Sequence, residues 1–277
     1  MPVIATNTAA NSALRYLNSN ASEQSSILSK LASGSRITKA SDDAAGLAIG
    51  TRVQSDVTTL SQAATNASQG IAILQAADGG MARIGDILQR MKALATQSNS
   101  GSVTDNERAY IDAEFQQLTD EIDGIAKGTR YNGESLLDGT SDYVTGTGID
   151  FMVGTDSTDT IKVEIDDVDA TALGVATLDV TTQTTAQAAL TAIDSAIDAI
   201  SQARASVGAV MSRFEFRAEN IATSSENLSS AQSAVMDADV AEEKSALSSA
   251  DVKTQAAIAA LSQANQMPQN LLSLLKS

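Results

Sequence analysis

Proline occurs in this chain of 277 residues only at positions 2 and 268. Because proline removes a hydrogen bond from a helix interior and clashes with the preceding turn, residues 3–267 can form long uninterrupted helices. Aromatic residues make up only 3% of the chain and Trp is absent, whereas Ala, Ser, Thr, Gln, Leu and Ile dominate. This composition is typical of long helices that pack through small side chains. The sequence therefore predicts a mainly α protein in which long antiparallel helices form a coiled-coil rod.

One heptad register runs through the second half of the chain. Eleven of its fourteen seam positions are apolar, and the exceptions are Arg204, Ser225 and Gln232. A seam of this length predicts a coiled coil, about 70 Å long at 1.5 Å per residue. Thr184 followed by Gln187 has the pattern of a capping box and predicts the start of this helix. The seam positions are 190, 193, 197, 200, 204, 207, 211, 214, 218, 221, 225, 228, 232 and 235.

Two further helices are predicted in the first third of the chain. The first spans about residues 5–32 and ends at Gly34, since glycine is favoured just after a helix. Its predicted seam is Ala10, Leu14, Leu17, Ala21, Gln24, Leu28 and Leu31. The second begins near Ser41 or Asp42 and runs towards Gly101. Gly46 and Gly50 predict loop or irregular helix before about residue 56, because glycine weakens a helix interior.

Start signals define two more helices. Thr104 with Glu107 forms a capping box, and the spacing of Ile111, Phe115, Leu118, Ile122 and Ile125 predicts a helix up to Gly128. Asp239 with Glu242 marks the start of the last helix, which is predicted to run to about Gln266. Pro268 is expected to kink or interrupt it.

The middle of the chain has a different composition. Residues 138–185 are rich in Thr, Asp and Gly, and their ten acidic residues against Lys162 alone give a charge of −9 of the total −16. Residues 161–165 alternate between apolar and polar, and residues 148–153 and 173–180 are strand-like, so small β-hairpins are predicted. A chain of helix, rods, hairpins, rod and helix is expected to place its termini together and the acidic β-containing region, about residues 130–185, at the opposite tip.

Composition also limits the function. A net charge of −16 argues against binding to nucleic acid or to an anionic membrane. The chain has no His, the commonest general base and metal ligand, and no Cys. We therefore expect no catalytic site, no metal site and no cofactor. There is no run of 18 apolar residues and no pattern of a cleaved secretion signal.

Three local features carry alternative interpretations. Asp42 and Asp43 could form a paired-carboxylate acid–base site, although capping of a loop explains them as well. The aspartates between 138 and 179 could bind Ca²⁺, but they lack the spacing of a known calcium loop, and a solvated acidic surface is favoured. Gly79 and Gly80 lie in a helical pattern without a phosphate-loop Lys and are interpreted as a local irregularity of the helix.

Both ends of the chain are amphipathic and unusually apolar for termini. Each apolar stripe can be covered by the other terminus or by other copies of the chain. Because a two-helix pair leaves much apolar surface in water, we expect both termini to be disordered in the monomer and to fold on assembly. The residues predicted to carry this polymerisation are Leu14, Leu17, Leu28, Leu31, Leu261, Met267, Leu271, Leu272, Leu274 and Leu275.

Three segments have distinctive sequences: LASGSRITKASDDAAGLAIGTR at 31–52, RYNGESLLDG at 130–139 and ALSQANQMPQNLLSLLKS at 260–277. Together they resemble the bacterial flagellins, the subunits of the flagellar filament. The resemblance implies a minimal form with a terminal helix pair as inner-tube domain (1–33 and 240–277), a spoke (34–56) and a three-helix outer-tube domain (57–239). Only about 50 residues separate the two outer-tube halves, so an inserted domain is not expected.

The resemblance also implies roles for individual residues. Arg36, Asp42, Asp43 and Arg52 would make polar contacts between subunits in the spoke. A second patch would pack one outer-tube domain on the next, and in the family the vertebrate innate flagellin receptor detects it. Ala93 stands where many members carry an acidic residue, which leaves receptor recognition open. The patch consists of Leu88, Gln89, Arg90, Leu94, Gln97 and Glu114.

The implied function is that of a structural subunit, not an enzyme, that self-assembles into a helical extracellular filament, the propeller for motility. The implied partners are further copies of the chain, the flagellar type III export machinery, an export chaperone, and the junction and cap proteins. Export without a cleaved signal peptide is expected. The alternatives are a hook–filament junction protein of the same family and an adhesive or enzymatic variant. The short middle and the lack of His argue against the latter.

Overall fold

The computed structural model describes residues 6–276, and the side chains of residues 6–267. It divides into two compact units, which we call the terminal unit (Met1–Asp56 and Asn227–Ser277) and the central unit (Val57–Glu226). The predicted division into inner-tube, spoke and outer-tube domains, with bounds at residues 33, 56 and 239, stays a prediction. The helices α2 (Ala44–Ser98) and α4 (Gln183–Met236) contribute to both units.

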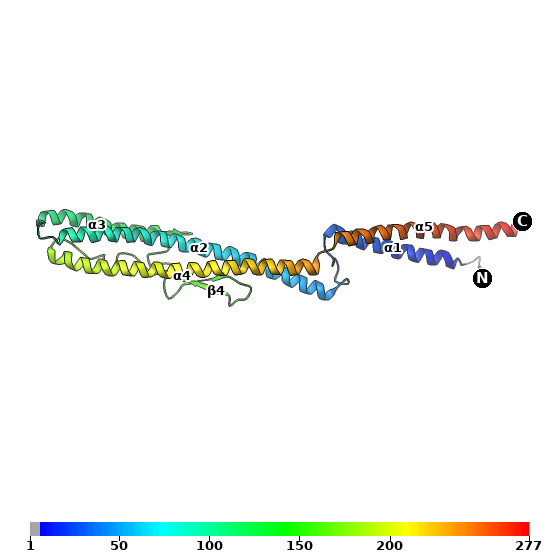
Figure 1. Cartoon of the computed structure of the whole chain (residues 1–277), viewed down its shortest axis with the longest axis horizontal. Helices are drawn as coiled ribbons and strands as arrows, with labels where there is room; N and C mark the ends of the chain where they lie inside the picture. The colour runs from blue at the N-terminus through cyan, green and yellow to red at the C-terminus, as the bar shows by residue number, and fades with distance from the viewer. Residues whose placement is uncertain (1–5, 277) are drawn as a thin grey trace. The chain divides into compact units, whose positions relative to one another are not determined.

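The terminal unit contains the antiparallel helices α1 (Thr8–Ser33) and α5 (Val240–Lys276), which lie side by side (Figure 1). The Asn7 side chain accepts a hydrogen bond from the amide of Ala10 and caps α1. Gly34 ends this helix at a φ of 70°, the left-handed conformation that glycine adopts readily. Asp239 caps α5 by accepting hydrogen bonds from the amides of Ala241 and Glu242. Gly34 and Asp239 confirm the predicted end of α1 and the predicted start of α5.

Two predictions about helix interruptions are wrong. Helix α5 continues through Pro268 to Lys276, because proline removes one internal hydrogen bond but leaves the others of the helix in place. Helix α2 is regular from Ala44, although two glycines lie in its first turns. A methyl group at Gly46 would overlap Ile37, and one at Gly50 would overlap the side chain of Met236. These glycines therefore permit close approach of neighbouring segments and do not disrupt the helix.

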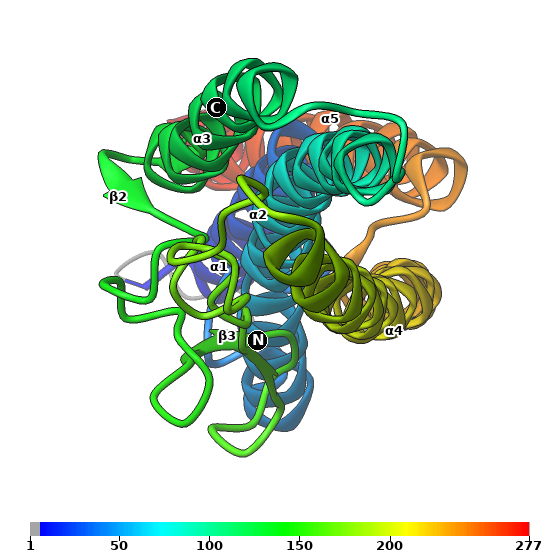
Figure 2. The same ribbon diagram turned by 90° about the vertical axis from the view of Figure 1, so that its left-hand side faces the viewer.

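The central unit is built on α2, α3 (Asp105–Gly128) and α4, which run side by side (Figure 2). The predicted capping box of Thr104 and Glu107 starts α3. Ion pairs join α2 to α3 through Arg90 and Glu114, at 2.6 Å, and α2 to α4 through Asp78 and Arg204, at 2.7 Å. The core between the helices includes the fully buried side chains of Phe115, Phe214, Ile73, Leu74, Met81, Ile84, Leu88, Met91, Ile122 and Ile193.

The seam of α4 agrees with the predicted register at alternate positions only. Its buried residues are Ala186, Ala189, Ile193, Ala196, Ile200, Ala203, Val207, Phe214 and Ile221. Ala189, Ala196 and Ala203 are buried in place of the predicted positions 190, 197 and 204, because each shares a helix face with the buried residue four positions later. Arg204 instead faces solvent and pairs with Asp78. The helix also begins before the predicted cap, where Thr182 and Thr185 exchange side-chain-to-amide hydrogen bonds of 3.1 and 3.2 Å.

Two small hairpins follow α3. The first joins β1 (Arg130–Tyr131) to β2 (Glu134–Ser135) through Asn132 and Gly133, whose φ angles of 51° and 90° are typical of a tight hairpin turn. The second pairs β3 (Ile149–Met152) with β4 (Thr160–Val163), as the alternation predicted. The predicted strand at 173–180 is wrong, because these residues form turns and irregular backbone.

Residues 166–182, which we call the return segment, lie along α3. Side chains on one stripe of that helix hold its backbone. Asp123 accepts from the amide of Ala170, Gln116 donates to the carbonyl of Leu178, and Asp112 accepts from the amide of Val180, each at 2.9 Å. The prediction of an acidic tip beyond the rods is therefore wrong. Within the central unit, the acidic segment is fastened lengthwise against the helices.

Candidate assembly surface

The contact between α1 and α5 is made mostly of small and polar residues. On α1 the shielded heptad positions are Ala10, Ala13, Leu17, Asn20, Gln24, Ile27 and Leu31. On α5 they are Glu243, Leu247, Ala250, Thr254, Ala257, Leu261 and Ala264. Nine of these fourteen residues are Ala, Asn, Gln, Glu or Thr. This contact, which we call the terminal seam, buries little apolar surface for its length.

Polar contacts flank the terminal seam at three levels. The Asn7 side chain donates to the carbonyl of Ala264 at 2.8 Å, and Gln24 donates to the carboxylate of Asp251 at 2.5 Å. Lys30 forms an ion pair of 3.3 Å with Glu243. Thr254 differs from these residues, because its hydroxyl oxygen is buried and has no hydrogen-bond partner among the side chains and backbone that the structure describes. The polar contacts fix the antiparallel register, while the unpaired hydroxyl weakens the pair.

The predicted seam of α1 is displaced by one residue at every second position. Ala13, Asn20 and Ile27 are shielded instead of Leu14, Ala21 and Leu28. Leu14 and Leu28 are 45% and 48% exposed. Because Leu14, Ala21 and Leu28 are spaced by seven residues, they form a continuous stripe beside the seam, which we call the α1 flank. Leu17 and Leu31, by contrast, lie in the seam as predicted.

The second helix of the pair also exposes apolar side chains. Val252, Ile258 and Met267 of α5 are 64%, 54% and 58% exposed, whereas Leu261 belongs to the terminal seam. The exposure of Val252 and Ile258 was not predicted, because these two aliphatic residues do not share a heptad position and form no recognisable stripe in the sequence. The predicted polymerisation residues Leu271, Leu272, Leu274 and Leu275 have side chains outside the described residues.

Burial differs greatly between the two units. Among the side chains that the structure describes in the terminal unit, the buried apolar ones are Ile27, Ile37, Ala250 and Ala264. The central unit, in contrast, has a core of aromatic and large aliphatic residues that come from all three helices. Because packing of an apolar face supplies most of the stability of a protein helix, the terminal pair has little stability of its own.

The predicted spoke residues are largely engaged within their own subunit. Arg36 donates to the carbonyl of Val235 through its guanidinium and to that of Met236 through its amide. Asp43 accepts from the amide of Gly46 and caps α2. Burial tends to raise the pKa of Asp42, but hydrogen bonds from Lys39 and Thr38 outweigh it and lower that pKa below 3.8.

Two carboxylates that serve as local caps do not form an acid–base pair. The capping interpretation of Asp42 and Asp43 is thus the one that the hydrogen bonds support. Arg52 is exposed on α2. All four spoke residues are exposed, although Arg36, Asp42 and Asp43 also make hydrogen bonds within the subunit.

The predicted patch on α2 and α3 is only partly at the surface. Leu88 and Leu94 are 0% and 3% exposed, so they cannot contact a second molecule, and including them was wrong. They occupy the α2 positions that face the core of the central unit. Gln89, Arg90 and Gln97 are exposed beside them. Glu114 accepts two hydrogen bonds from the guanidinium of Arg90, at 2.6 and 2.9 Å.

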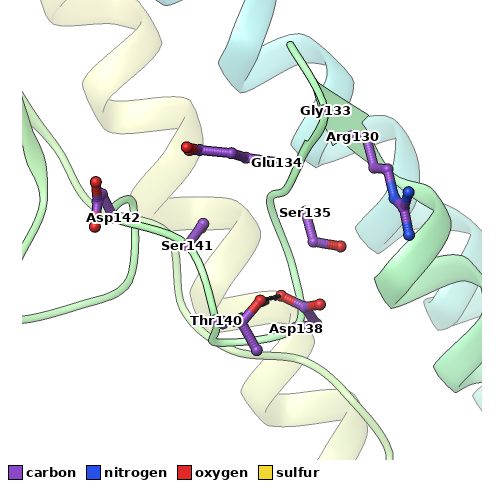
Figure 3. Close-up of a pocket in the computed structure, with 8 residues that line it drawn as sticks. All are labelled: Arg130, Gly133, Glu134, Ser135, Asp138, Thr140, Ser141 and Asp142. Carbon is purple, nitrogen blue, oxygen red and sulfur yellow. Dashed lines mark hydrogen bonds between the residues drawn. The ribbon is translucent and has the colours of Figure 1, made fainter.

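An open polar hollow of about 360 Å³ lies at the first hairpin, between Arg130 and Asp142 (Figure 3). Its charged groups do not converge, because the Arg130 guanidinium and the Glu134 carboxylate point in different directions. Asp138 is held by Thr140, which donates to it from its hydroxyl and its amide. Among residues 6–276, no group of three His, Cys, Asp or Glu side chains is placed to hold a metal ion.

No helix in the described part of the chain is long and apolar enough to cross a membrane. Two family models match the sequence. The bacterial flagellin N-terminal helical region matches residues 4–142, and the bacterial flagellin C-terminal helical region matches residues 190–275. The chain belongs to the flagellin family. No middle domain separates the two matched regions, so this is a minimal flagellin.

Similar proteins support the same assignment. Flagellin from Halalkalibacterium halodurans is 38% identical over 276 residues, which cover 99% of this chain and 100% of the relative. Flagellin from Bacillus subtilis is 38% identical over 299 aligned positions, with 98% of each chain covered. The crystal structure of Bacillus cereus flagellin is 32% identical, with a TM-score of 0.51 over 57% of this chain and 88% of that one.

This flagellin is a structural subunit that self-assembles into the helical filament of the bacterial flagellum. The filament lies outside the cell and acts as the propeller for motility. The hook–filament junction alternative is not favoured, because relatives that match from end to end are filament flagellins. A structural role also argues against an enzyme.

Proposed function

We propose that neighbouring copies complete the terminal unit, with the α1 flank and the outer side chains of α5 as contact surfaces. The supporting observation is that this unit buries few apolar side chains while Leu14, Leu28, Val252 and Ile258 remain about half exposed or more. Covering the exposed half of a large aliphatic side chain contributes about 1 kcal/mol. Four such residues per subunit supply several kcal/mol, which the isolated pair lacks.

Assembly is then coupled to ordering of the helix pair. The buried, unpaired hydroxyl of Thr254 and the polar residues of the terminal seam keep the pair weak in the monomer. Contacts along the α1 flank supply the missing stabilisation in the filament, so helix content rises on polymerisation. The segment that includes Arg36, Asp42, Asp43 and Arg52 connects α1 to α2 along the chain, and its four exposed charged residues are the groups available to a neighbour.

The remaining partners are proposed from the flagellin family. The chain is exported by the flagellar type III machinery, with a chaperone and without a cleaved signal peptide, and it meets the junction and cap proteins at the filament ends. The exposed Gln89, Arg90 and Gln97, with Glu114, form the part of the α2–α3 patch that a copy or the innate flagellin receptor could contact.

Substitutions in the α1 flank test this assignment. Leu14→Gln with Leu28→Gln should raise the lowest protein concentration that sustains filaments at least tenfold, as measured by sedimentation. Because both side chains are exposed, the circular dichroism of the monomer should not change. Leu14→Met with Leu28→Met is the matched control and should polymerise normally. Wild-type-like filaments from the glutamine variant would refute a role for the flank.

The C-terminal residues are tested separately. Removal of residues 271–277 should abolish filaments seen by electron microscopy, because the predicted polymerisation leucines are lost. The central helices should keep their helical signal, since their core lies in another unit. Normal filaments from the shortened chain would exclude Leu271, Leu272, Leu274 and Leu275 as required contacts.

A further inference from the structure

The central unit exposes an aromatic side chain in the middle of α4. Phe216 is 74% exposed, although Phe214, two residues earlier, is fully buried. The chain has only four Phe and four Tyr, so an exposed Phe on a well-packed helix is unusual. Exposed aromatic residues beside arginine are typical of the centres of protein interfaces.

A groove lies beside Phe216, between α4 and β4. It has a volume of about 330 Å³ and is lined by Thr160, Ile161, Arg213, Phe216, Arg217 and Asn220. Arg217 pairs with Asp159 at 3.4 Å, whereas Arg213 makes no ion pair within the described part of the chain. We call this surface the Phe216 groove. It is an aromatic and basic site on a molecule with a net charge of −16.

A surface of opposite character lies on α3. Tyr110 is 79% exposed, and Glu114, Gln117 and Glu121 follow it at four, seven and eleven residues, which places them on the same helix face. Glu114 is shared with Arg90. Glu121 is exposed and forms no ion pair among the residues that the structure describes. We call this surface the Tyr110 face.

We propose that the Phe216 groove of one subunit binds the Tyr110 face of a second copy of the chain. Phe216 packs against Tyr110, and Arg213 pairs with Glu121. The inference rests on the filament function and specifies one of its contacts. A contact between the Phe216 grooves of two subunits is disfavoured, because it would place the Arg213 side chains of both subunits together and their positive charges would repel. A contact between two unlike surfaces is also the kind that can propagate into an open helical filament.

Charge reversal tests the pair. Arg213→Glu alone places like charges at every contact, and so does Glu121→Arg alone. Each variant should raise the lowest concentration that sustains filaments about tenfold at low salt. An equal mixture should polymerise at nearly the wild-type concentration, because the acidic groove of one variant meets the basic face of the other in both directions. The double variant should behave like the mixture, and 1 M salt should reduce all these differences.

Lys244→Glu is the matched control for net charge, since Lys244 is exposed on α5 and belongs to the terminal unit, whereas both surfaces belong to the central unit. Its mixture with Glu121→Arg should not be rescued. Rescue by this control, or wild-type polymerisation of both single variants, would overturn the proposed contact. If the Phe216 groove instead binds a different protein, both single variants should polymerise like the wild type. Failure of the wild-type chain to form filaments would instead refute the filament function.

Cross-linking gives an independent measure. The chain has no Cys, so a variant with Asn220→Cys and Gln117→Cys carries one thiol on each surface while keeping both aromatic residues. A short bismaleimide should give a ladder of covalent oligomers from filaments and none from monomers. Each single cysteine variant should give no ladder, and filaments of the double variant that give only monomers would contradict the proposed contact.

Discussion

Substitution of Thr254 measures how much one unpaired hydroxyl destabilises the terminal seam. The hydroxyl of this residue is buried against α1 and has no hydrogen-bond partner among the described residues. An unpaired buried polar group costs about 1–3 kcal/mol. Thr254→Val keeps the shape of the side chain and replaces the hydroxyl with a methyl group, so it should stabilise the α1–α5 pair by about 1–2 kcal/mol.

The gain should appear in the assembly equilibrium, because each added subunit has to form the pair. A stabilisation of 1–2 kcal/mol changes an equilibrium constant by about 5–30-fold. The concentration of free subunit that remains with filaments should fall by that factor, as measured by sedimentation at fixed temperature and salt. Thermal depolymerisation followed by circular dichroism should also shift upwards.

Two matched variants define the result. Thr223→Val makes the same chemical change at an exposed hydroxyl that donates to the carbonyl of Glu219, and it should not increase polymerisation. Thr254→Ser keeps the hydroxyl but removes a methyl group, and it should weaken the pair. If Thr254→Val polymerises no better than the wild type, the hydroxyl is satisfied and the seam is not weakened at this position.

Three further predictions concern the central unit, each with thermal unfolding as the measurement. Gly79→Ala should stabilise α2 by about 1 kcal/mol, whereas Gly80→Ala should destabilise it, because its Cβ would overlap Leu137; equal effects would contradict the packing. Arg108→Ala should cost about 2–4 kcal/mol, because the buried guanidinium donates to the backbone carbonyls of Ser98, the last residue of α2, and Ser100. Burial and three nearby carboxylates raise the pKa of Asp167, so its neutral form stabilises the fold below the unfolded pKa and this contribution is lost as pH rises through the folded pKa. Asp167→Asn should therefore raise the melting temperature at pH 7 and lose that advantage at pH 3; an equal gain at both values would exclude charge as the cause.

The ends of the helices could be predicted because they depend on local chemistry. Gly34, the Thr104–Glu107 pair and Asp239 each act on backbone groups within a few residues. Such short-range signals need no knowledge of the partner helix. The buried Arg108, which closes the turn between α2 and α3, was missed because its acceptors are carbonyl groups that carry no sequence signature.

The seam registers could not be predicted, for a reason common to α1 and α4. Apolar residues occupy adjacent positions, as in Ala13–Leu14 and Ile27–Leu28, so two heptad frames fit equally well. The predicted residue was wrong both where it was the larger of the two, as at Ala13–Leu14, and where it was the smaller, as at Asn20–Ala21. The position of the partner helix is a tertiary property, and it decides which residue is shielded and which is left for a neighbour.

The path of the acidic segment could not be predicted from the sequence either. Its composition indicated an exposed region, but three of its ten acidic residues are exposed and the other seven are half-buried. Its position depends on Asp112, Gln116 and Asp123. These residues hold backbone groups between 47 and 68 positions away in the chain. A stripe of polar residues on a helix face looks like a solvated surface until its partners are known.

The return segment is held against α3 by hydrogen bonds, whereas the turn between β3 and β4 makes few contacts and can accept changes in sequence. Between β3 and β4, residues 155–158 are exposed. The two strands on either side are held by their own pairing, and the contact of Phe151 with Phe214 anchors the hairpin to α4. Extra sequence inserted in this turn would thus preserve the pairing of β3 with β4 and the contact of Phe151 with Phe214. The turn is a natural site for new domains in evolution and for foreign peptides displayed in many copies along a filament.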